Sequence, residues 1–355
     1  MVAEAAELGS TPKALRFFGK DFALYRGESG KLVLLDGHCI HMGAHLAKGS
    51  GSSIVVAGRQ IEGDSIRCPY HAWRYNSNGQ VDDIPNFDGP CPKNAKVKSY
   101  PVRETLGAIM MWHDSEGSEP DYPPPTLEEW DDSQWINGVY DHLGILPIHP
   151  QEILDNMADS NHLGPTHGAE PEYFSNEYSA HICRQTQGGF RKEYNAYLRT
   201  YTWYTGPGLL ISRMIIGEDR STELIFHTPV ENGSVKVWNN VVMRTATQSP
   251  SDSEKVMQKQ YQQAVLAALA QDFDIWANKV PALTIKALPN ERNFALGRTW
   301  YRQFYNPRST AHEYQLKIQG EHFVPHKAAP TPDCYLNTNR FIFSSINNTA
   351  EEIAK

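Results

Sequence analysis

Two short stretches of the sequence combine thiol and imidazole side chains at a spacing that suits metal binding. In "HCIHMGAHL", residues 38–46, one residue separates Cys39 from His41, and in "RCPYHAW", residues 67–73, two residues separate Cys68 from His71. Each stretch therefore offers one thiolate and one neutral imidazole, both of which bind transition metals. If the two cysteines hold one iron and the two histidines hold another, the four side chains can bind a two-iron cluster.

Such a mixed ligand set is that of a Rieske [2Fe–2S] centre, in which two imidazoles replace two thiolates and raise the reduction potential. The alternative is a zinc knot, because zinc also binds two cysteines and two histidines. Zinc fingers usually supply a cysteine pair and then a histidine pair, whereas this chain interleaves the two types. The interleaved order and the flanking "CPYHAW" favour the cluster.

A second group of candidate ligands lies in "ILDNMADSNHLGPTHG", which contains Asp159, His162 and His167. An iron that activates O2 is typically held by two imidazoles and one carboxylate on one face, which leaves the other positions open. Residues five apart do not share a face of a regular α-helix, so we expect a broken turn or a bulge at the Gly-Pro pair between the histidines. The alternative is two unrelated histidines near a helix end.

The carboxylate is expected from a long helix that begins with Ser251 and Glu254 in capping-box spacing. Asp272 lies on its apolar stripe, where a carboxylate is costly unless it is paired or metal-bound, whereas Asp274 lies on the other side and is expected to be solvated. The alternative for Asp272 is a salt-bridged core acid. The expected stripe consists of Tyr261, Val265, Ala268, Leu269 and Trp276.

The elements that must position these residues suggest two domains and an α+β fold. From about Ala14 to Asp114, short strand-like runs broken by Gly and Asp turns predict an all-β domain, including a strand in "SIVVAG". The proline run at residues 115–126 suits a connector, so we expect domains at 1–118 and 119–355. The second domain is predicted to contain a helix over 151–163 and strands over 172–247, followed by the long helix.

Together, these motifs resemble those of the Rieske non-heme iron oxygenases, in which a Trp follows the last cluster ligand as Trp73 does here. "DNMADSNHLGPTH", "QDFDIW" and "RTWYRQFY" are most similar to the 3-ketosteroid 9-alpha-hydroxylase oxygenase components. The chain departs from the family pattern at Ile40, where Pro is usual, and at Ala72, where Gly is usual. It also places 26 residues between His41 and Cys68, more than the family usually has, and we expect the extra residues to form an inserted hairpin.

The resemblance implies a Rieske [2Fe–2S] domain followed by a helix-grip (START-like) catalytic domain with an antiparallel sheet. It implies a homotrimer, in which Asp159 links the iron site to His71 of a neighbouring subunit, because the two metals of one chain are too far apart for fast electron transfer. The implied ligands are Cys39, His41, Cys68 and His71 for the cluster and His162, His167 and Asp272 for a mononuclear Fe(II).

The implied activity is a monooxygenase reaction that uses O2 and two electrons from a ferredoxin or an NAD(P)H-dependent flavin reductase. The expected substrate is a large hydrophobic molecule, a steroid or a steroid-like polycycle. An alternative is hydroxylation or O/N-demethylation of an aromatic acid or amine, which a buried Arg such as Arg213 or Arg244 would favour. A non-enzymatic alternative is a Rieske electron carrier or a zinc-stapled binding protein.

Composition and net charge indicate which partners and which location to expect. The 33 basic and 41 acidic residues give a net charge of −8, which offers no electrostatic reason to expect nucleic acid or anionic lipid as a partner. The acidic first residues do not resemble a secretory signal, and no apolar run approaches the roughly 20 residues of a membrane helix. We therefore expect a cytoplasmic protein without nucleic-acid or membrane partners.

Overall fold

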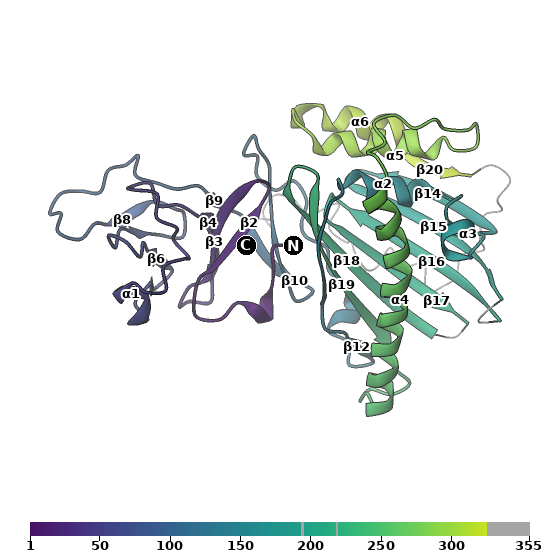
Figure 1. The fold of residues 1–355 in the computed structure, drawn as a ribbon, viewed down its shortest axis with the longest axis horizontal. Coiled ribbons are helices and arrows are strands. Elements are labelled where there is room, and N and C mark those ends of the chain that lie inside the picture. Colours follow the sequence, from purple (N-terminus) through teal and green to yellow (C-terminus); the bar gives the residue numbers. More distant parts are fainter. Residues whose placement is uncertain (193–194, 218, 325–355) are drawn as a thin grey trace. The chain divides into compact units, whose positions relative to one another are not determined.

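The computed structural model describes residues 1–192, 195–217 and 219–324, and it divides into two compact units (Figure 1). Met1–Pro124 and the short segment Val230–Asn232 form the N-terminal unit, and the remaining described residues form the C-terminal unit. The division after Pro124 falls within the proline-rich connector. Residues beyond 324 lie outside the described part of the chain, although the predicted second domain extends to residue 355.

The N-terminal unit contains three small antiparallel sheets. The first has the order β1-β11-β10 (Ala3–Glu4, Ala108–Met111, Val102–Thr105), the second β2-β3-β4-β9 (Lys13–Phe17, Lys20–Arg26, Leu32–Asp36, Ser99–Tyr100), and the third β5-β6-β7-β8 (Ile61–Glu62, Ser65–Arg67, Arg74–Tyr75, Val81–Asp83). A single turn of 3-10 helix, η1 (Ala5–Glu7), follows β1. The mainly β character of this unit agrees with the expectation from the short strand-like runs.

The segment between the two cysteine-histidine motifs differs from the prediction. The expected strand in "SIVVAG" is wrong, because Ser53–Val56 forms one helical turn, α1. Its backbone is satisfied locally, since the amides of Val56 and Ala57 donate to the carbonyls of Ser52 and Ser53. No neighbouring strand is then needed to satisfy these groups. The hairpin of the segment is formed instead by β5 and β6, which come after this turn.

The core of the N-terminal unit surrounds both cysteines of the two motifs. Cys39 and Cys68 are buried in one cluster with Tyr25, Leu46 and Tyr75. This packing connects the two motif loops to strands β3 and β7, so the loops are fixed by the same core that stabilises the sheets.

The C-terminal unit is built on one antiparallel sheet in the order β12-β19-β18-β17-β16-β15-β14-β20, with β13 also paired to β19. Most of its strands are long and follow one another in the chain, so neighbours pair through short hairpins. The strands are β12 (Trp135–Asn137), β13 (Asp141–Leu146), β14 (Tyr173–Ser179), β15 (Ile182–Arg191), β16 (Ala196–Thr205), β17 (Leu209–Ile216), β18 (Asp219–Glu231), β19 (Ser234–Arg244) and β20 (Gly320–Phe323).

Helices lie over this sheet, and Figure 1 shows the long helix α4 running across it. The α-helices are α2 (Gln151–Ala158), α3 (Leu163–His167), α4 (Asp252–Asn278), α5 (Asn293–Tyr301) and α6 (Ala311–Ile318). Single 3-10 turns occur at η2 (Glu128–Trp130), η3 (Arg302–Phe304) and η4 (Arg308–Thr310). A core of α2, α5 and α6 side chains packs on strand residues such as Tyr178, Tyr204 and Leu210.

The long helix has the predicted capping box, because Ser251 and Glu254 exchange side-chain and backbone hydrogen bonds. Most of the predicted stripe faces inward, because Tyr261, Val265, Leu269 and Trp276 are half-buried and Asp272 is buried, but Ala268 is exposed. The sequence did not identify Gln258 and Gln262, which are also buried. The two glutamines donate to the backbone carbonyls of Val241 and Val139, so amide hydrogen bonds rather than apolar packing hold the first half of the helix.

The predicted helix over 151–163 is shorter than expected. Helix α2 ends at Ala158 because the backbone of Asp159 is extended, with φ −99° and ψ 106°. The Asp159 side chain accepts hydrogen bonds from the amides of Asn161 and His162, which forms a local turn that competes with the helix. Asp159 and His162 are therefore neighbours through a turn, and the expectation that they share a helix is wrong.

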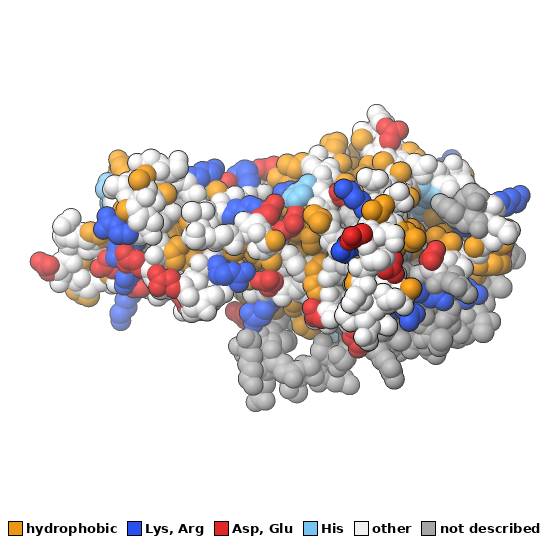
Figure 2. All heavy atoms as spheres, turned by 90° about the horizontal axis from the view of Figure 1, so that it is seen from below, with side chains coloured by type: hydrophobic (Ala, Val, Ile, Leu, Met, Phe, Trp, Pro, Cys, Tyr) orange, Lys and Arg blue, Asp and Glu red, His pale blue; other side chains and the backbone are white. Residues whose placement is uncertain are grey.

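The surface drawn in Figure 2 mixes basic and acidic side chains, with hydrophobic ones scattered among them. No helix in the described residues is long and apolar enough to cross a membrane.

Candidate metal centres

Each cysteine-histidine motif forms a tight loop closed by backbone hydrogen bonds. In the first loop, the Cys39 amide donates to the carbonyl of Ala44 at 2.8 Å, and the Gly43 amide donates back to Cys39. In the second loop, the Cys68 amide donates to the carbonyl of Trp73 at 2.9 Å. Gly43 and Ala72 have positive φ values of 74° and 60°, a region that favours glycine. Ala72 thus occupies the position where the family pattern has Gly.

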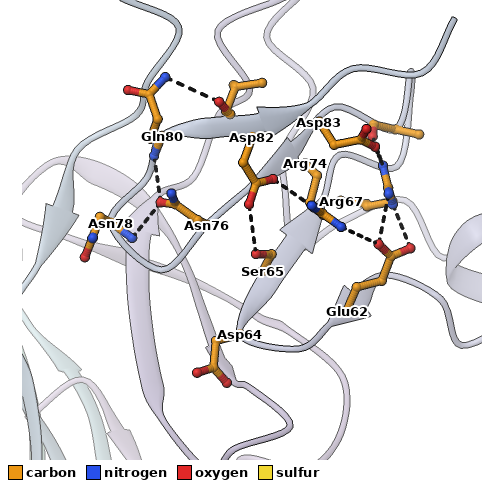
Figure 3. A network of polar contacts seen from close by, with 12 residues as sticks. Glu62, Asp64, Ser65, Arg67, Arg74, Asn76, Asn78, Gln80, Asp82 and Asp83 are labelled. Atoms are coloured by element: carbon orange, nitrogen blue, oxygen red, sulfur yellow. Dashed lines mark hydrogen bonds and ion pairs between the residues drawn. The ribbon is translucent and has the colours of Figure 1, made fainter. Parts of the chain in front are cut away.

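A charged network holds the second loop from outside (Figure 3). Arg67, which directly precedes Cys68, donates to Glu62 at 2.7 Å, to Asp83 at 2.7 Å and to the carbonyl of Ala72 at 2.8 Å. Arg74, just after the loop, bonds Asp82 at 2.8 Å and Glu62 at 3.2 Å. The loop is therefore anchored at both ends. Arg67 bonds both carboxylate oxygens of Glu62, a bidentate contact that Lys could not reproduce.

The two predicted ligand types occupy different environments. Cys39 and Cys68 are buried, and a hydrogen bond from the Cys68 thiol is the largest cause that lowers the pKa of Cys39 to about 5. His41 and His71 are exposed, with ring centroids 4.8 Å apart, and His41 stacks on Trp73 at 4.5 Å. A buried sulfur pair beside an exposed imidazole pair fits a cluster with one thiolate-bound and one imidazole-bound iron.

Tyr75 is a residue of this centre that the sequence did not identify. Its hydroxyl lies 3.0 Å from Cys39 Sγ and accepts a hydrogen bond from the Ile40 amide at 3.2 Å. Because the amide occupies a lone pair of the phenol oxygen, the O–H is free to donate to the sulfur. Proline, usual in the family at position 40, has no amide hydrogen for this contact.

The second centre brings together three residues that are distant in the chain. Ligand atoms of His162, His167 and Asp272 all lie within 4.8 Å of one another, and His167 Nε2 is 3.4 Å from Asp272 Oδ2. Helix α3 lies between the histidines as one regular turn that Gly168 ends in the left-handed region. The predicted bulge between the histidines is therefore wrong, because the Gly-Pro pair lies in the first turn of α3, where Pro is tolerated.

Hydrogen bonds define which ring nitrogen of each histidine faces the centre. His162 Nδ1 lies 2.8 Å from the carbonyl of Asp159, and His167 Nδ1 lies 2.9 Å from Gln271 Oε1. Both partners are acceptors, so each Nδ1 carries the proton and each Nε2 keeps its lone pair. A hydrogen bond from the ring nitrogen that does not bind the metal orients a metal-binding histidine and increases its basicity. The donor set of two Nε2 atoms and one carboxylate fits an open iron site.

Two amides near this centre were not identified from the sequence. Asn156 Nδ2 lies 3.1 Å from His162 Nε2, on the side where a metal would bind. Gln271 directly precedes Asp272 in "QDFDIW", but no spacing rule distinguishes it from any other polar helix residue. Only the contact with His167 gives it a role.

Burial and charge act in opposite directions on the two histidines. Desolvation lowers the pKa of His162, which favours the neutral ring. The hydrogen bond with Asp272 raises the pKa of His167 above its usual value. A carboxylate that stabilises positive charge on its neighbour is also suited to stabilise a cation bound between them.

Asp159, the predicted bridging acid, lies directly beside this centre. Its carbonyl contacts His162 Nδ1, and its carboxylate Oδ2 is 3.7 Å from the same nitrogen. The side chain is about one quarter accessible, so it can be reached from outside the unit.

Comparison with known proteins agrees with the residues described above. A family model for the Rieske [2Fe-2S] domain matches residues 1–101, and a model for the 3-ketosteroid 9alpha-hydroxylase C-terminal domain matches residues 111–305. A probable 3-ketosteroid-9-alpha-monooxygenase oxygenase component of Rhodococcus rhodochrous is 28% identical over 312 residues, which is 83% of this chain and 75% of the relative. A Mycobacterium tuberculosis oxygenase component of the same name is 26% identical over 84% of this chain and 78% of its own length.

A cholesterol 7-desaturase of Hemicentrotus pulcherrimus is 36% identical, but only over 44% of this chain and 32% of the relative. Among solved structures, Pseudomonas putida CBB5 NdmA with caffeine has a TM-score of 0.69 at 14% identity, covering 94% of this chain and 96% of that one. Dicamba monooxygenase bound to 3,6 dichlorosalicylic acid has a TM-score of 0.63 at 17% identity, covering 89% and 96%. These two structures share the fold. With more than half of its residues matched by one family model, the chain belongs to the 3-ketosteroid 9alpha-hydroxylase family of Rieske non-heme iron oxygenases.

Proposed function

We propose that this chain is an oxygenase component that hydroxylates a C–H bond of a 3-ketosteroid or a closely related steroid polycycle, using O2 and two externally supplied electrons. The observation that carries the proposal is the convergence of His162, His167 and Asp272. All three lie within residues 111–305, the segment that the steroid hydroxylase family model matches. The two relatives from Rhodococcus rhodochrous and Mycobacterium tuberculosis described above are named as 3-ketosteroid-9-alpha-monooxygenase oxygenase components.

In this proposal, His162 and His167 bind the mononuclear iron through Nε2, and Asp272 supplies the carboxylate. Cys39, His41, Cys68 and His71 hold the cluster. Iron bound at the triad would supply O2 activation, and the cluster would supply electrons one at a time. The carbonyl of Asp159 and the amide of Gln271 keep the two imidazoles in the metal-binding tautomer.

A homotrimer is part of the proposal, with Asp159 acting as the link to His71 of a neighbouring copy. In the N-terminal unit, exposed Ile40, Met42 and Tyr70 neighbour the two cluster histidines in the sequence. Apolar side chains exposed around polar electron-transfer groups are typical of an interaction surface.

The C-terminal unit offers a matching apolar surface near Asp159. Leu283 and Leu288 are exposed in the segment that follows α4. The Leu288 amide donates to Glu291, and the same Glu291 accepts a hydrogen bond from Asn161, two residues after Asp159. A second copy that covers this surface would bring its cluster histidines toward Asp159.

The oxygenase component requires an electron-transfer partner and acts on a hydrophobic substrate. We propose a ferredoxin or an NAD(P)H-dependent flavin reductase as that partner. The cytoplasmic location stays a prediction from the sequence.

The alternative of an aromatic acid substrate receives no support from the two strand arginines. Arg213 is completely buried, but its guanidinium bonds Glu129 at 2.7 Å and lies over the ring of Trp203. Its charge is thus balanced within the chain and is not available for a substrate carboxylate. Arg244, at the end of β19, is exposed.

The test is turnover of a panel of steroids and aromatic acids with a surrogate reductase under labelled dioxygen. We expect labelled, hydroxylated product from a steroid only, and about three irons per chain, two in the cluster and one mononuclear. About two irons per chain would indicate an electron carrier, and zinc without iron would indicate a stapled binding protein.

Asp272→Ala is expected to lower the iron content to about two per chain and to abolish product, while the visible spectrum of the cluster remains. Asp274→Ala is the matched control, because Asp274 is an exposed residue of the same helix. Full activity of the Asp272→Ala protein would contradict the proposed site.

A further inference from the structure

A row of polar side chains crosses the centre of the C-terminal sheet on one face. Gln185, Thr202, Ser212 and Glu223 stand opposite one another on the successive strands β15, β16, β17 and β18. The hydroxyls of Thr202 and Ser212 bond each other at 2.8 Å. Residues directly opposite on paired strands point to the same face, so the four side chains form one continuous row.

This row lies on the face that α2 and α4 cover. Gln185 donates to the carbonyl of Met157, near the end of α2, at 3.0 Å. Met214, which shares a face with Ser212 because it is two residues along β17, is contacted by Tyr261 of α4. The same two helices lead into Asp159 and carry Asp272, so the polar row faces the side of the unit that holds the candidate iron ligands.

On β17 and β18, the row is less completely covered than the adjacent positions of the opposite face. Ser212 and Glu223 keep 8% and 7% of their surface accessible, whereas their chain neighbours Arg213 and Thr222 are at 0%. Interiors are normally close-packed, so residual accessible surface beneath two helices indicates room beside the row.

Glu223 is the one ionisable member of the row, and it has little to compensate a charge. Its Oε1 accepts a hydrogen bond from Asn239 Nδ2 at 2.6 Å, and burial raises the pKa of its carboxyl to about 8. Because the amide donates to Oε1, the proton of the neutral acid resides on Oε2. Within the described residues, Oε2 makes no hydrogen bond, and unlike Asn239 Oδ1 it is not fully buried. An O–H group on Oε2 can therefore donate to the oxygen of a ligand that reaches this accessible surface.

We propose that Glu223 is a specificity-determining residue that, as a protonated carboxylic acid, donates a hydrogen bond to a carbonyl or hydroxyl oxygen of the substrate. This inference rests on the proposed steroid hydroxylase function and adds to it the group that recognises the polar end of an otherwise apolar molecule. A pocket that hydrogen-bonds a substrate oxygen rejects the analogue that lacks it more strongly than any purely apolar pocket can.

The dimensions of the unit suit a long substrate. Asn239, which bonds Glu223, stands opposite Asp141 on the paired strand β13. Asp141 in turn accepts a hydrogen bond from Gln262 of α4. Gln262 and Asp272 share one stripe of α4 and are ten residues apart, which is about 15 Å along the helix axis. If Glu223 lies at a similar distance from the triad, a substrate anchored at Glu223 and attacked at the iron is extended, as a polycycle is.

The experiment compares ligands that differ by one oxygen, using the full chain loaded with iron and cluster. Binding of 3-keto and 17-keto steroids and of the corresponding deoxy analogues is measured by calorimetry for the wild type, Glu223→Met and Glu223→Gln. We expect Glu223→Met to weaken binding of one keto ligand about tenfold and to leave its deoxy analogue unchanged. Glu223→Gln keeps an N–H donor and is expected to remain within about threefold of the wild type.

Thr222→Val is the matched control, because Thr222 neighbours Glu223 on the opposite face and its buried hydroxyl has no partner among the described residues. It should not alter the keto-to-deoxy ratio. Equal weakening of keto and deoxy ligands by Glu223→Met, or the same loss in Glu223→Gln, would overturn the inference alone. A wild-type protein that binds no steroid would overturn the proposed function as well.

Discussion

Tyr75→Phe isolates the effect of one hydrogen bond on the cluster. The phenol O–H lies 3.0 Å from Cys39 Sγ, and the Ile40 amide donates to the phenol oxygen. A donor to a cluster sulfur stabilises the reduced, more negative state, so its removal should lower the reduction potential. The ring itself is completely buried, and Phe retains its packing.

The size of the effect follows from the hydrogen-bond energy. A net contribution of about 0.5–1.5 kcal/mol to the difference between oxidation states corresponds to about 20–60 mV for a one-electron couple. The assay is a redox titration of the purified oxygenase, followed by the visible absorbance of the cluster or by its resonance signal at low temperature.

The matched control is Tyr25→Phe. Tyr25 belongs to the same core, but its hydroxyl donates to the carbonyl of Asp64 at 2.9 Å and to no sulfur. Both variants should lose about 1 kcal/mol of stability, and only Tyr75→Phe should shift the potential. An unchanged potential in Tyr75→Phe, or an equal shift in both variants, would refute the reasoning.

Two further predictions concern the loops and helices around the centres. Ala72→Gly should raise the free energy of unfolding of the N-terminal unit by about 0.5–1 kcal/mol, because glycine adopts the φ of 60° of Ala72 without strain. Denaturant unfolding measures this change, and a loss of stability would contradict the prediction. Gln271→Leu should weaken mononuclear iron binding about 10- to 100-fold, because His167 loses the acceptor that orients it. The measurement is iron retention during dialysis against a chelator, with Asp274→Asn as the control. Equal retention in both variants would exclude a role of Gln271 in orienting His167.

Sequence patterns predicted the local features of this chain well. The capping box of Ser251 and Glu254 forms as expected, because its two residues are three apart and need no tertiary partner. The strands β2, β3 and β4 fall within the short strand-like runs, broken by Gly and Asp turns, that predicted an all-β domain. The strand expected at "SIVVAG" failed, since β-branched residues alone do not provide the neighbouring strand that a sheet requires.

The candidate metal ligands were predicted from residue type and spacing and, for Asp272, from the resemblance to a known family. Their assignment as ligands remains a prediction. Asp159 was expected on a helix, but a turn that its own side chain forms brings it to His162. Nothing in the sequence indicated Tyr75, Gln271 or Asn156, because each acquires its role through a contact made only in the folded chain.

By itself, the sequence determined which residue types are available for metal chemistry, since cysteine, histidine and carboxylate spacing within a loop or a helix turn is a local property. Tertiary structure alone decided that Asp272 meets His162 and His167 across more than a hundred residues, and that Glu223 lies buried in a polar row. The physical reason is that burial and the pairing of distant strands set the electrostatic environment of a side chain, and neither is encoded in the residues next to it.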